Sequence, residues 1–230
     1  MSAAASTLGV EALARAYEGA APGAVLRAAA DAFAPGRLAV VSAFGPGSLV
    51  VIHLLAELGL ELPVLFVDTL HHFPETLELA ERVRERYGLD LRVYRPAASR
   101  AEFEARWGER LWERDLDLYQ QVAKVEPFRR ATAGLEGWIT GRRRDQAATR
   151  AHLPVFEGGL QVRVNPLAAW TRRQVWEFIL AHGIPYNPLH DRGYASIGDE
   201  PLTTPLQAGE DERAGRWRGA GRTECGIHLS

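Results

Sequence analysis

The chain has 230 residues, a length that suits one large domain or one domain with a small extension. Its formal net charge of −2 at pH 7 does not indicate a nucleic-acid-binding protein, so any anion site would have to come from local arginine clusters. The single cysteine excludes an internal disulfide and any zinc or iron–sulfur site built from several thiolates of this chain.

No targeting or membrane segment is expected from the sequence. Residues 1–19 lack the basic region and the apolar core of a secretory signal. The apolar stretches are all well under the ~18 residues that a membrane-spanning helix needs. We therefore expect a cytoplasmic protein with no membrane and no nucleic-acid partner, in which Cys225 is a free thiol because the cytoplasm is reducing.

Residues 1–36 are predicted to form an N-terminal helical segment. Apolar residues recur there at helical spacing, and Pro22-Gly23 divides them into two short helices. Continuous apolar runs at 37–44 and 62–69 then predict two buried parallel strands, because strands covered on both faces read as unbroken apolar stretches. A helix through Leu49–Leu60 is expected to connect them.

An amphipathic helix is predicted after Pro74, and Gly88 closes it before a third strand at 89–96. The block 100–136 is predicted to be mostly helical. A fourth strand is expected at 135–141.

Further along, Gly158-Gly159 is a turn signal between two β-rich runs and predicts a hairpin. Residues 171–183 predict a helix that starts at Thr171 as N-cap and ends at a glycine. Pro, Gly and charged residues dominate the chain from Asn187 on, so residues 187–230 are predicted to form an irregular and partly mobile C-terminal tail.

Strand and helix alternate over residues 37–141, which predicts an α/β fold with a doubly wound, mostly parallel sheet. In such sheets, ligands bind at the carboxyl ends of the strands. We assign residues 37–186 to this α/β domain.

The first candidate site is the loop Ser42–Ser48, between the first strand and its helix, with Phe44, Gly45 and Gly47 inside it. Glycines let the backbone approach a ligand, and a helix start offers unpaired N–H groups that suit a phosphate or sulfate. An ordinary strand–helix turn is the alternative. The loop is neither a Walker A loop nor a dinucleotide-binding glycine fingerprint.

The second candidate site follows the second strand, where Asp68 and Thr69 end the apolar run. Polar groups at this place often hold a ribose or a base. The adjacent His71 and His72 are better read as capping or solvated residues than as metal ligands, because neighbours in sequence rarely face the same ion. We expect no metal site and no cofactor.

The third candidate site is the run Arg142, Arg143 and Arg144, with Gln146 close behind and Arg150 further on, directly after the fourth strand. Guanidinium groups bind phosphate or sulfate oxygens in a two-pronged manner. The position agrees with that of the glycine loop and favours a site for an anion. A solvated basic turn paired with carboxylates is the alternative.

The fourth candidate site is the end of the chain. Four arginines precede the single cysteine, namely Arg213, Arg216, Arg218 and Arg222. Such neighbours lower the pKa of a thiol and make Cys225 a candidate nucleophile, although a lone thiol is more often inert. His228 is a candidate helper, and Glu224 is either an orienting residue or a simple charge partner.

Together these segments resemble the phosphoadenylyl-sulfate (PAPS) reductase family, the sulfonucleotide reductases of sulfate assimilation. The resemblance covers about residues 37–228 and is carried by SAFGPGSLVVIHLL, FVDTLHHFPETLEL, KVEPFRRA, GRRRDQAATRAHLP, VNPLAAWTRRQVWEFI, GIPYNPLHDRGYASIGDEP and GEDERAGRWRGAGRTECGIH. The order of these pieces and the closing ECGIH are highly specific.

The resemblance implies a Rossmann-like fold of the adenine-nucleotide alpha-hydrolase type, related to ATP pyrophosphatases, so residues 37–186 would bind a nucleotide. The Ser42–Ser48 loop would be a modified pyrophosphate loop, and it lacks the Ser-Gly-Gly-x-Asp-Ser form of ATP-cleaving relatives. The family also implies that Cys225 is the nucleophile and that Arg143, Arg144 and the tail arginines bind the nucleotide or its sulfonate.

Family members that reduce adenylyl sulfate (APS) with a [4Fe–4S] cluster carry four cysteines at positions that correspond here to Tyr119, Gln120, Asp199 and Leu202. Without those thiolates a cluster is chemically implausible. Cluster-free members usually prefer PAPS, and APS remains open because that correlation has exceptions.

The resemblance thus implies that Cys225 attacks the sulfonate of PAPS, forms an S-sulfonate and releases adenosine 3′,5′-bisphosphate. With no second cysteine, the reductant must come from outside, and the family suggests thioredoxin or glutaredoxin and a homodimeric enzyme. An ATP-dependent adenylating enzyme and a non-catalytic nucleotide sensor are the alternatives.

Overall fold

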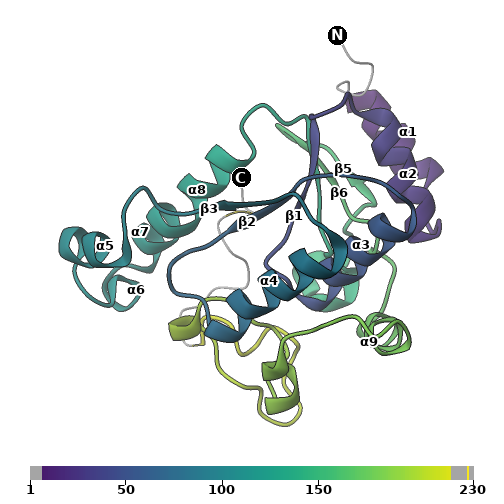
Figure 1. Ribbon diagram of the computed structural model, residues 1–230. Helices are drawn as coiled ribbons and strands as arrows, with labels where there is room; N and C mark the ends of the chain where they lie inside the picture. The colour runs from purple at the N-terminus through teal and green to yellow at the C-terminus, as the bar shows by residue number, and fades with distance from the viewer. Residues whose placement is uncertain (1–6, 219–226, 228–230) are drawn as a thin grey trace.

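A six-stranded sheet forms the centre of the protein, with helices on both of its faces (Figure 1). The structure is a computed structural model, and it describes residues 7–218 and residue 227. The strands are β1 (Leu38–Val41), β2 (Val64–Val67), β3 (Leu91–Tyr94), β4 (Gly137–Ile139), β5 (Phe156–Glu157) and β6 (Val162–Val164). Their order across the sheet is β3-β2-β1-β4-β6-β5.

All neighbouring strands are parallel except β5, which pairs with β6 in antiparallel fashion. The chain adds β2 and β3 on one side of β1 and then returns to place β4 on the other side. The strand order therefore reverses between β1 and β4, and this switch point is where open parallel sheets bind their ligands.

Nine α-helices lie among the described residues. They are α1 (Thr7–Ala16), α2 (Pro22–Ala32), α3 (Pro46–Glu57), α4 (Pro74–Tyr87), α5 (Arg100–Trp107), α6 (Leu111–Arg114), α7 (Leu116–Gln120), α8 (Glu126–Ala131) and α9 (Arg172–Ala181). A π-helical turn, Gln121–Val125, joins α7 to α8. None of the helices within the described ranges is long and apolar enough to cross a bilayer.

Local sequence signals explain where several helices begin and end. Proline occupies the first turn of α2, α3 and α4, where a backbone N–H would have no hydrogen-bond partner within the helix. Gly88 ends α4 in the left-handed conformation, with φ of 60°. Thr171 starts α9 with a capping box, in which its hydroxyl accepts from the N–H of Gln174.

Side-chain alternation along the strands divides the core between the two faces of the sheet. Val40 of β1 and Phe66 of β2 join the main cluster, which also contains apolar residues of α2, α3, α4 and α9. On the opposite face, Ala39 and Leu65 pack with Ala131 of α8. Both faces are covered, and this explains why the strands read as continuous apolar runs.

The predicted α/β architecture is confirmed, including the four parallel strands, the hairpin around Gly158-Gly159 and the helix over 171–183. Between residues 187 and 218 the tail is irregular, as predicted, with short 3₁₀ turns and isolated bridges at Asp199 and between Thr203 and Arg216. The described part of the tail, up to residue 218, lies on one side of the sheet, in yellow-green at the bottom of the view (Figure 1). The domain boundaries and the mobility of the tail stay predictions.

His190, in the 3₁₀ turn Pro188–Arg192, anchors the start of this segment. Its Nδ1 lies 2.6 Å from the carbonyl oxygen of Tyr194, so Nδ1 donates, and its ring packs edge-on against Trp176. Burial lowers the pKa of His190 to about 4, so the folded protein keeps this ring neutral where an unfolded chain would protonate it.

We therefore expect the free energy of unfolding to fall as the pH falls from about 6.5 towards 4, because the unfolded state takes up the proton first. Between pH 7 and pH 4.5, the parent should lose about 2 kcal/mol more than His190→Asn, which keeps an N–H donor near the Nδ1 position. Urea unfolding of both proteins at the two pH values measures the difference. Equal losses would show that His190 titrates normally in the folded protein.

Candidate active site

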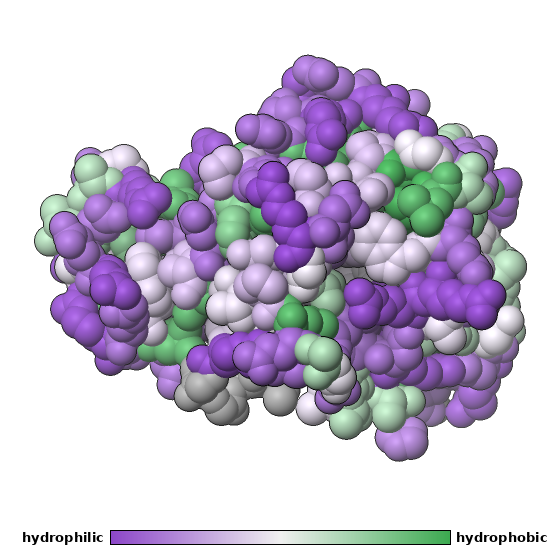
Figure 2. Space-filling view, turned by 90° about the horizontal axis from the view of Figure 1, so that it is seen from below, coloured by the Kyte–Doolittle hydropathy of each residue, from purple (hydrophilic) through white to green (hydrophobic). Residues whose placement is uncertain are grey.

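A cavity of about 220 Å³ opens at the switch point of the sheet. Its walls come from the loop after β1, the end of β2, the loop after β4, the π-helical turn and two stretches of the C-terminal segment, 195–198 and 212–217. Figure 2, seen from the side on which that segment lies, shows a mainly hydrophilic face with small hydrophobic areas. The cavity therefore joins chain segments that lie far apart in the sequence.

The loops after β1 and β4 touch each other through two glycines. A β-carbon on Gly47 would lie 2.2 Å from the carbonyl oxygen of Gly141, and one on Gly141 would lie 2.2 Å from the carbonyl carbon of Gly47. Real side chains never approach backbone so closely, so both positions require glycine. This contact brings the start of α3 against the end of β4.

Hydroxyl groups fix the shape of the first loop. The Ser42 hydroxyl donates to the hydroxyl of Ser48 at 2.9 Å and accepts from the N–H of Phe44 at 2.9 Å, while Ser48 donates to the carbonyl oxygen of Gly45. No side chain among the described residues caps the N-terminus of α3. Gly45, Gly47 and Ser48 line the cavity, so the start of this helix, with the positive end of its dipole, forms part of the wall and suits an anion.

Phe44 has a φ of 55°, in the left-handed region that non-glycine residues rarely adopt. Its side chain is buried and packs edge-on against Phe66, with ring centroids 5.3 Å apart. The strained backbone turns the loop toward the cavity while the ring anchors it in the core. Phe44 therefore positions the loop, and its side chain does not line the cavity.

Basic side chains outnumber acidic ones in the described part of the cavity wall. Five of them line it, against the single carboxylate of Glu212; the five are Lys124, Arg142, Arg150, Arg213 and Arg216. Arg216 donates to the carbonyl oxygen of Ile197 at 3.1 Å and lies 4.4 Å from the ring centroid of Trp217. The wall as a whole suits a ligand with several negative charges.

Lys124 and Asp199 form a buried ion pair at this wall. Lys124 Nζ lies 2.9 Å from Asp199 Oδ2, the Thr69 hydroxyl donates to Oδ1 at 2.7 Å, and the carboxylate is fully buried. Burial alone would raise the pKa of Asp199, but Lys124, His72 and the Thr69 hydroxyl hold it well below its usual value. Asp199 is therefore ionised and holds the ammonium group in place.

The π-helical turn gives Lys124 its position. Such turns insert one extra residue into a helix and are frequent at functional sites. Here Lys124 reaches the cavity from the turn, while α8 continues behind it and packs on the sheet. The sequence offered no periodic signal for this turn, and Lys124 was not among the expected site residues.

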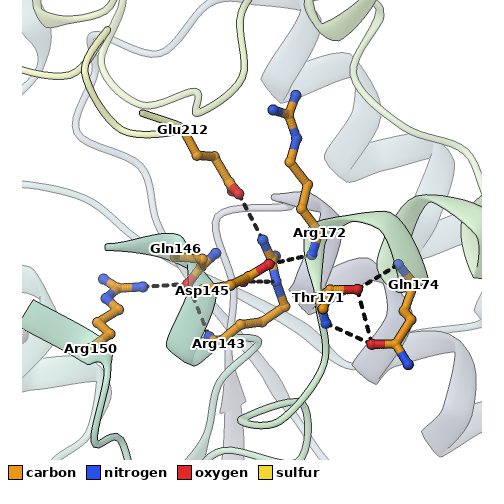
Figure 3. A network of polar contacts seen from close by, with 8 residues as sticks. All are labelled: Arg143, Asp145, Gln146, Arg150, Thr171, Arg172, Gln174 and Glu212. Atoms are coloured by element: carbon orange, nitrogen blue, oxygen red, sulfur yellow. Dashed lines mark hydrogen bonds and ion pairs between the residues drawn. The ribbon is translucent and has the colours of Figure 1, made fainter. Parts of the chain in front are cut away.

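Arg143 lies at the centre of a second polar network, at the exit of β4 (Figure 3). Its side chain is almost fully buried, with Nε 2.9 Å from Asp145 Oδ1 and Nη2 2.8 Å from Glu212 Oε2. Burial raises the pKa of Glu212, and Arg143 opposes this shift. Arg143 thus ties the C-terminal segment to the end of β4 through Glu212, while its Nε is used by Asp145 close by.

Gln146 links this network to the cavity. Its Oε1 accepts from the backbone N–H of Arg143 at 3.0 Å and from Arg150 Nη1 at 2.6 Å (Figure 3). Gln146 and Arg150 both line the cavity, and Arg150 is buried. The amide therefore orients the guanidinium group of Arg150 beside the ligand space.

Several predicted site residues do line the cavity. They are Ser42, Gly45, Gly47, Ser48, Arg142, Gln146, Arg213 and Arg216. The guanidinium group of Arg142 also contacts Glu157 and Asn165, so part of its charge is already offset.

Other predicted residues are held elsewhere. Asp68 pairs with Arg95 at 2.8 Å, and Thr69 reaches the cavity only through Asp199. Arg143 joins the network described above, whereas Arg144 pairs with Glu18 of the segment before α2, and Arg218 pairs with Glu210. These side chains do not line the cavity, and each has a hydrogen-bond or ion-pair partner elsewhere in the fold.

Cys225, Arg222, Glu224 and His228 lie outside the described residues, so their roles stay predictions. Ile227, which is described, is buried against Val67, Phe128 and Trp138 and lines the cavity.

The four positions that carry cysteines in cluster-binding relatives lie close to one another. Leu202 packs against the apolar cluster that contains Tyr119, and Gln120, the next residue in sequence, is also buried. Burial and the nearby Asp199 carboxylate raise the pKa of Tyr119. The Asp199 carboxylate is engaged by Lys124. Phenol, amide, carboxylate and alkyl groups are not the thiolate set that such a cluster requires.

Comparisons with known proteins show the family to which the chain is similar. The family model described as the phosphoadenosine phosphosulfate reductase domain matches residues 37–205. A probable phosphoadenosine phosphosulfate reductase of Schizosaccharomyces pombe is 45% identical over 81% of this chain and 73% of its own length. The phosphoadenosine 5′-phosphosulfate reductase of Gloeobacter violaceus is 44% identical over 95% of this chain and 93% of its own.

An adenosine 5′-phosphosulfate reductase of Halalkalibacterium halodurans also matches, with 42% identity over 78% of this chain and 79% of its own. Among solved structures, phosphoadenylyl-sulfate reductase from Candida auris in a phosphate complex superposes with a TM-score of 0.79, at 36% identity, over 86% of this chain and 98% of that one. Candida glabrata FMN adenylyltransferase shares the fold. It superposes with a TM-score of 0.55, at 19% identity, over 83% of this chain and 69% of that one.

Substituting the touching glycines should disturb the cavity at its base. Gly47→Ala is expected to lower the free energy of unfolding by about 2 kcal/mol, because its β-carbon would overlap backbone that cannot move aside. Gly45→Ala is the matched control, since a β-carbon there meets nothing within 4 Å and φ is −71°. Urea unfolding of both variants checks this, and equal stabilities would contradict the close approach.

Breaking the buried ion pair should lower the free energy of unfolding more than breaking an exposed pair does. Asp199→Asn should lower the free energy of unfolding by about 3 kcal/mol, because it leaves the Lys124 ammonium buried without its carboxylate. Glu177→Gln, which removes the exposed partner of Arg173, should leave the unfolding midpoint almost unchanged.

Adding Lys124→Met to Asp199→Asn should restore part of that loss, because the double variant buries no unpaired charge. If the double variant is less stable than Asp199→Asn alone, the unpaired Lys124 ammonium is not the cause of the lost stability.

Proposed function

Because the chain belongs to the phosphoadenosine phosphosulfate reductase family, we propose that it reduces 3′-phosphoadenylyl sulfate (PAPS) to sulfite and adenosine 3′,5′-bisphosphate, as a step of assimilatory sulfate reduction. The observation that carries the proposal is the cavity at the switch point of the sheet, with an uncapped helix start and five basic side chains in its described wall. This substrate carries several negative charges along phosphate and sulfate groups, which such a wall offsets.

Cys225 is the proposed nucleophile. Its thiolate attacks the sulfur atom, an S–S bond forms, the S–O bond to the phosphate breaks, and adenosine 3′,5′-bisphosphate leaves with the electron pair. A thiolate cannot approach a sulfate ringed by oxygens unless cations and N–H groups offset the charge, and this is the task of the cavity wall. We keep His228 as a proposed helper in this step.

The position of Ile227 supports this role for Cys225. Ile227 lines the cavity and follows Cys225 by two residues. Two residues of chain span at most about 7 Å, so a thiol tied to this contact is within reach of a ligand in the cavity.

The S-sulfonate on Cys225 must then be reduced by a dithiol. One thiolate of the reductant attacks Cys225 Sγ and displaces sulfite, and its second thiol resolves the mixed disulfide, so that the reductant ends as a disulfide. The chain has a single cysteine and cannot supply these thiols. We propose thioredoxin or glutaredoxin as the reductant, in the cytoplasm, and a homodimer as the working form.

Reduction of APS is the second candidate, because relatives named for that substrate match at comparable identity. The two substrates differ by the 3′-phosphate. Asp199, which is paired with Lys124, stands at a position where cluster-binding relatives carry a cysteine. This chain is therefore of the cluster-free type, and such members usually prefer PAPS. Adenylation with ATP has only the shared fold in its favour.

Mass spectrometry tests the proposal directly. Incubated with PAPS and no reductant, the protein should gain one SO3 group on Cys225, and Cys225→Ser should gain none while still binding the nucleotide. A nucleotide-binding sensor would keep its function in Cys225→Ser. With reduced thioredoxin added, sulfite should form faster from PAPS than from APS. No adduct on a sample that binds PAPS would remove the covalent mechanism, and faster release from APS would favour the second candidate.

A further inference from the structure

A second cluster of polar side chains lies outside the cavity wall, between α3 and α9. His53 and Glu57 are one turn apart on α3, and His182 follows the end of α9. One potential ligand atom from each residue lies within 4.8 Å of the other two. His182 is far from the other two residues in sequence, so no spacing motif could have indicated the whole cluster.

His53 presents a buried nitrogen to this cluster. The side chain is only 11% exposed, and its Nδ1 lies 3.0 Å from the hydroxyl of Tyr87. Nε2 is buried and makes no hydrogen bond within the described chain, although Glu57 Oε1 lies 3.2 Å away. In the tautomer that carries its proton on Nδ1, the Tyr87 hydroxyl accepts a hydrogen bond from that N–H, and Nε2 offers an electron pair on the side of Glu57.

The ring of His182 is held by a hydrogen bond and a stacking contact that leave its Nε2 available as a metal ligand. Its Nδ1 lies 2.9 Å from the carbonyl oxygen of Phe178, which can only accept, so Nδ1 carries the proton and Nε2 has a free electron pair. The ring stacks on Phe178, with centroids 3.9 Å apart. Arg86 holds the turn by donating to the carbonyl oxygens of His182 and Gly183.

The arrangement matches what a divalent transition metal requires. Two imidazoles and one carboxylate form a common zinc ligand set, and ligands about 2.0–2.1 Å from a tetrahedral ion lie about 3.3 Å from each other. The observed 3.2 Å between His53 Nε2 and Glu57 Oε1 fits one such edge. Hydrogen bonds from Nδ1 to Tyr87 or Phe178 resemble the outer contacts that orient ligating histidines.

We propose that His53, Glu57 and His182 bind a divalent transition-metal ion of the zinc type, with water at the fourth position. Glu57 and His182 are exposed, so the ion can enter from solvent and the two side chains can close the remaining distance. The ion would link α3, whose first turn borders the cavity, to α9. Its role is to brace two helices, and the proposal does not depend on the proposed function.

Zinc titration of the metal-free full chain tests the proposal, with a chromophoric chelator as competitor. We expect one equivalent to bind, and His182→Ala or Glu57→Gln to weaken the affinity at least tenfold. Both residues are exposed, so both variants should fold. His152→Ala, which removes an exposed histidine outside the cluster, should bind like the parent.

Repeating the titration in a Cys225→Ser background excludes the thiolate as a ligand. Cobalt in place of zinc should give the visible bands of a tetrahedral nitrogen and oxygen site without sulfur charge-transfer absorption. Zinc should also raise the melting temperature of the parent and not that of His182→Ala. Failure to bind one equivalent, or equal affinity in parent and His182→Ala, overturns the proposal.

Discussion

Direct backbone contact between Gly47 and Gly141 sets the geometry of the active site. No β-carbon fits between them, so the first turn of α3 and the loop after β4 lie in direct backbone contact. That contact lies where the strand order reverses, so it brings the start of α3 and the residues after β4 to one cavity. Every other group of the site is arranged around it.

Charge pairing decides which basic residues remain for a ligand. Arg143 has a carboxylate partner on another segment, Glu212 (Figure 3), and Arg144 pairs with Glu18, so both hold the structure together. Lys124 has a partner too, but its buried pair with Asp199 stands in the cavity wall and keeps the ammonium group oriented. A run of arginines is therefore not one binding unit, because each guanidinium is used by the nearest carboxylate that the fold provides.

The chemistry of the family explains why the cavity is basic and the chain contains only one thiol. Sulfonate transfer to sulfur needs a nucleophile that reaches an anionic centre and is then presented to a separate reductant. The proposed metal site belongs to a different part of the molecule, between α9 and the end of α3 that lies away from the cavity. It would add rigidity, whereas the cavity wall supplies the electrostatics.

The sequence by itself determined the α/β class, the strands, the glycine loop and the family, because apolar periodicity, glycine, proline and linear motifs are local properties of the chain. It also named Ser42, Gly47, Gln146 and Arg216 as candidate site residues, and these four line the cavity. Only the tertiary structure decided that Phe44 anchors the loop from the core and that Arg143 is a structural residue. Lys124 with Asp199, and His53 with His182, are pairs brought together across the fold. No local pattern records which distant group a side chain will meet, since burial and pairing depend on packing between segments.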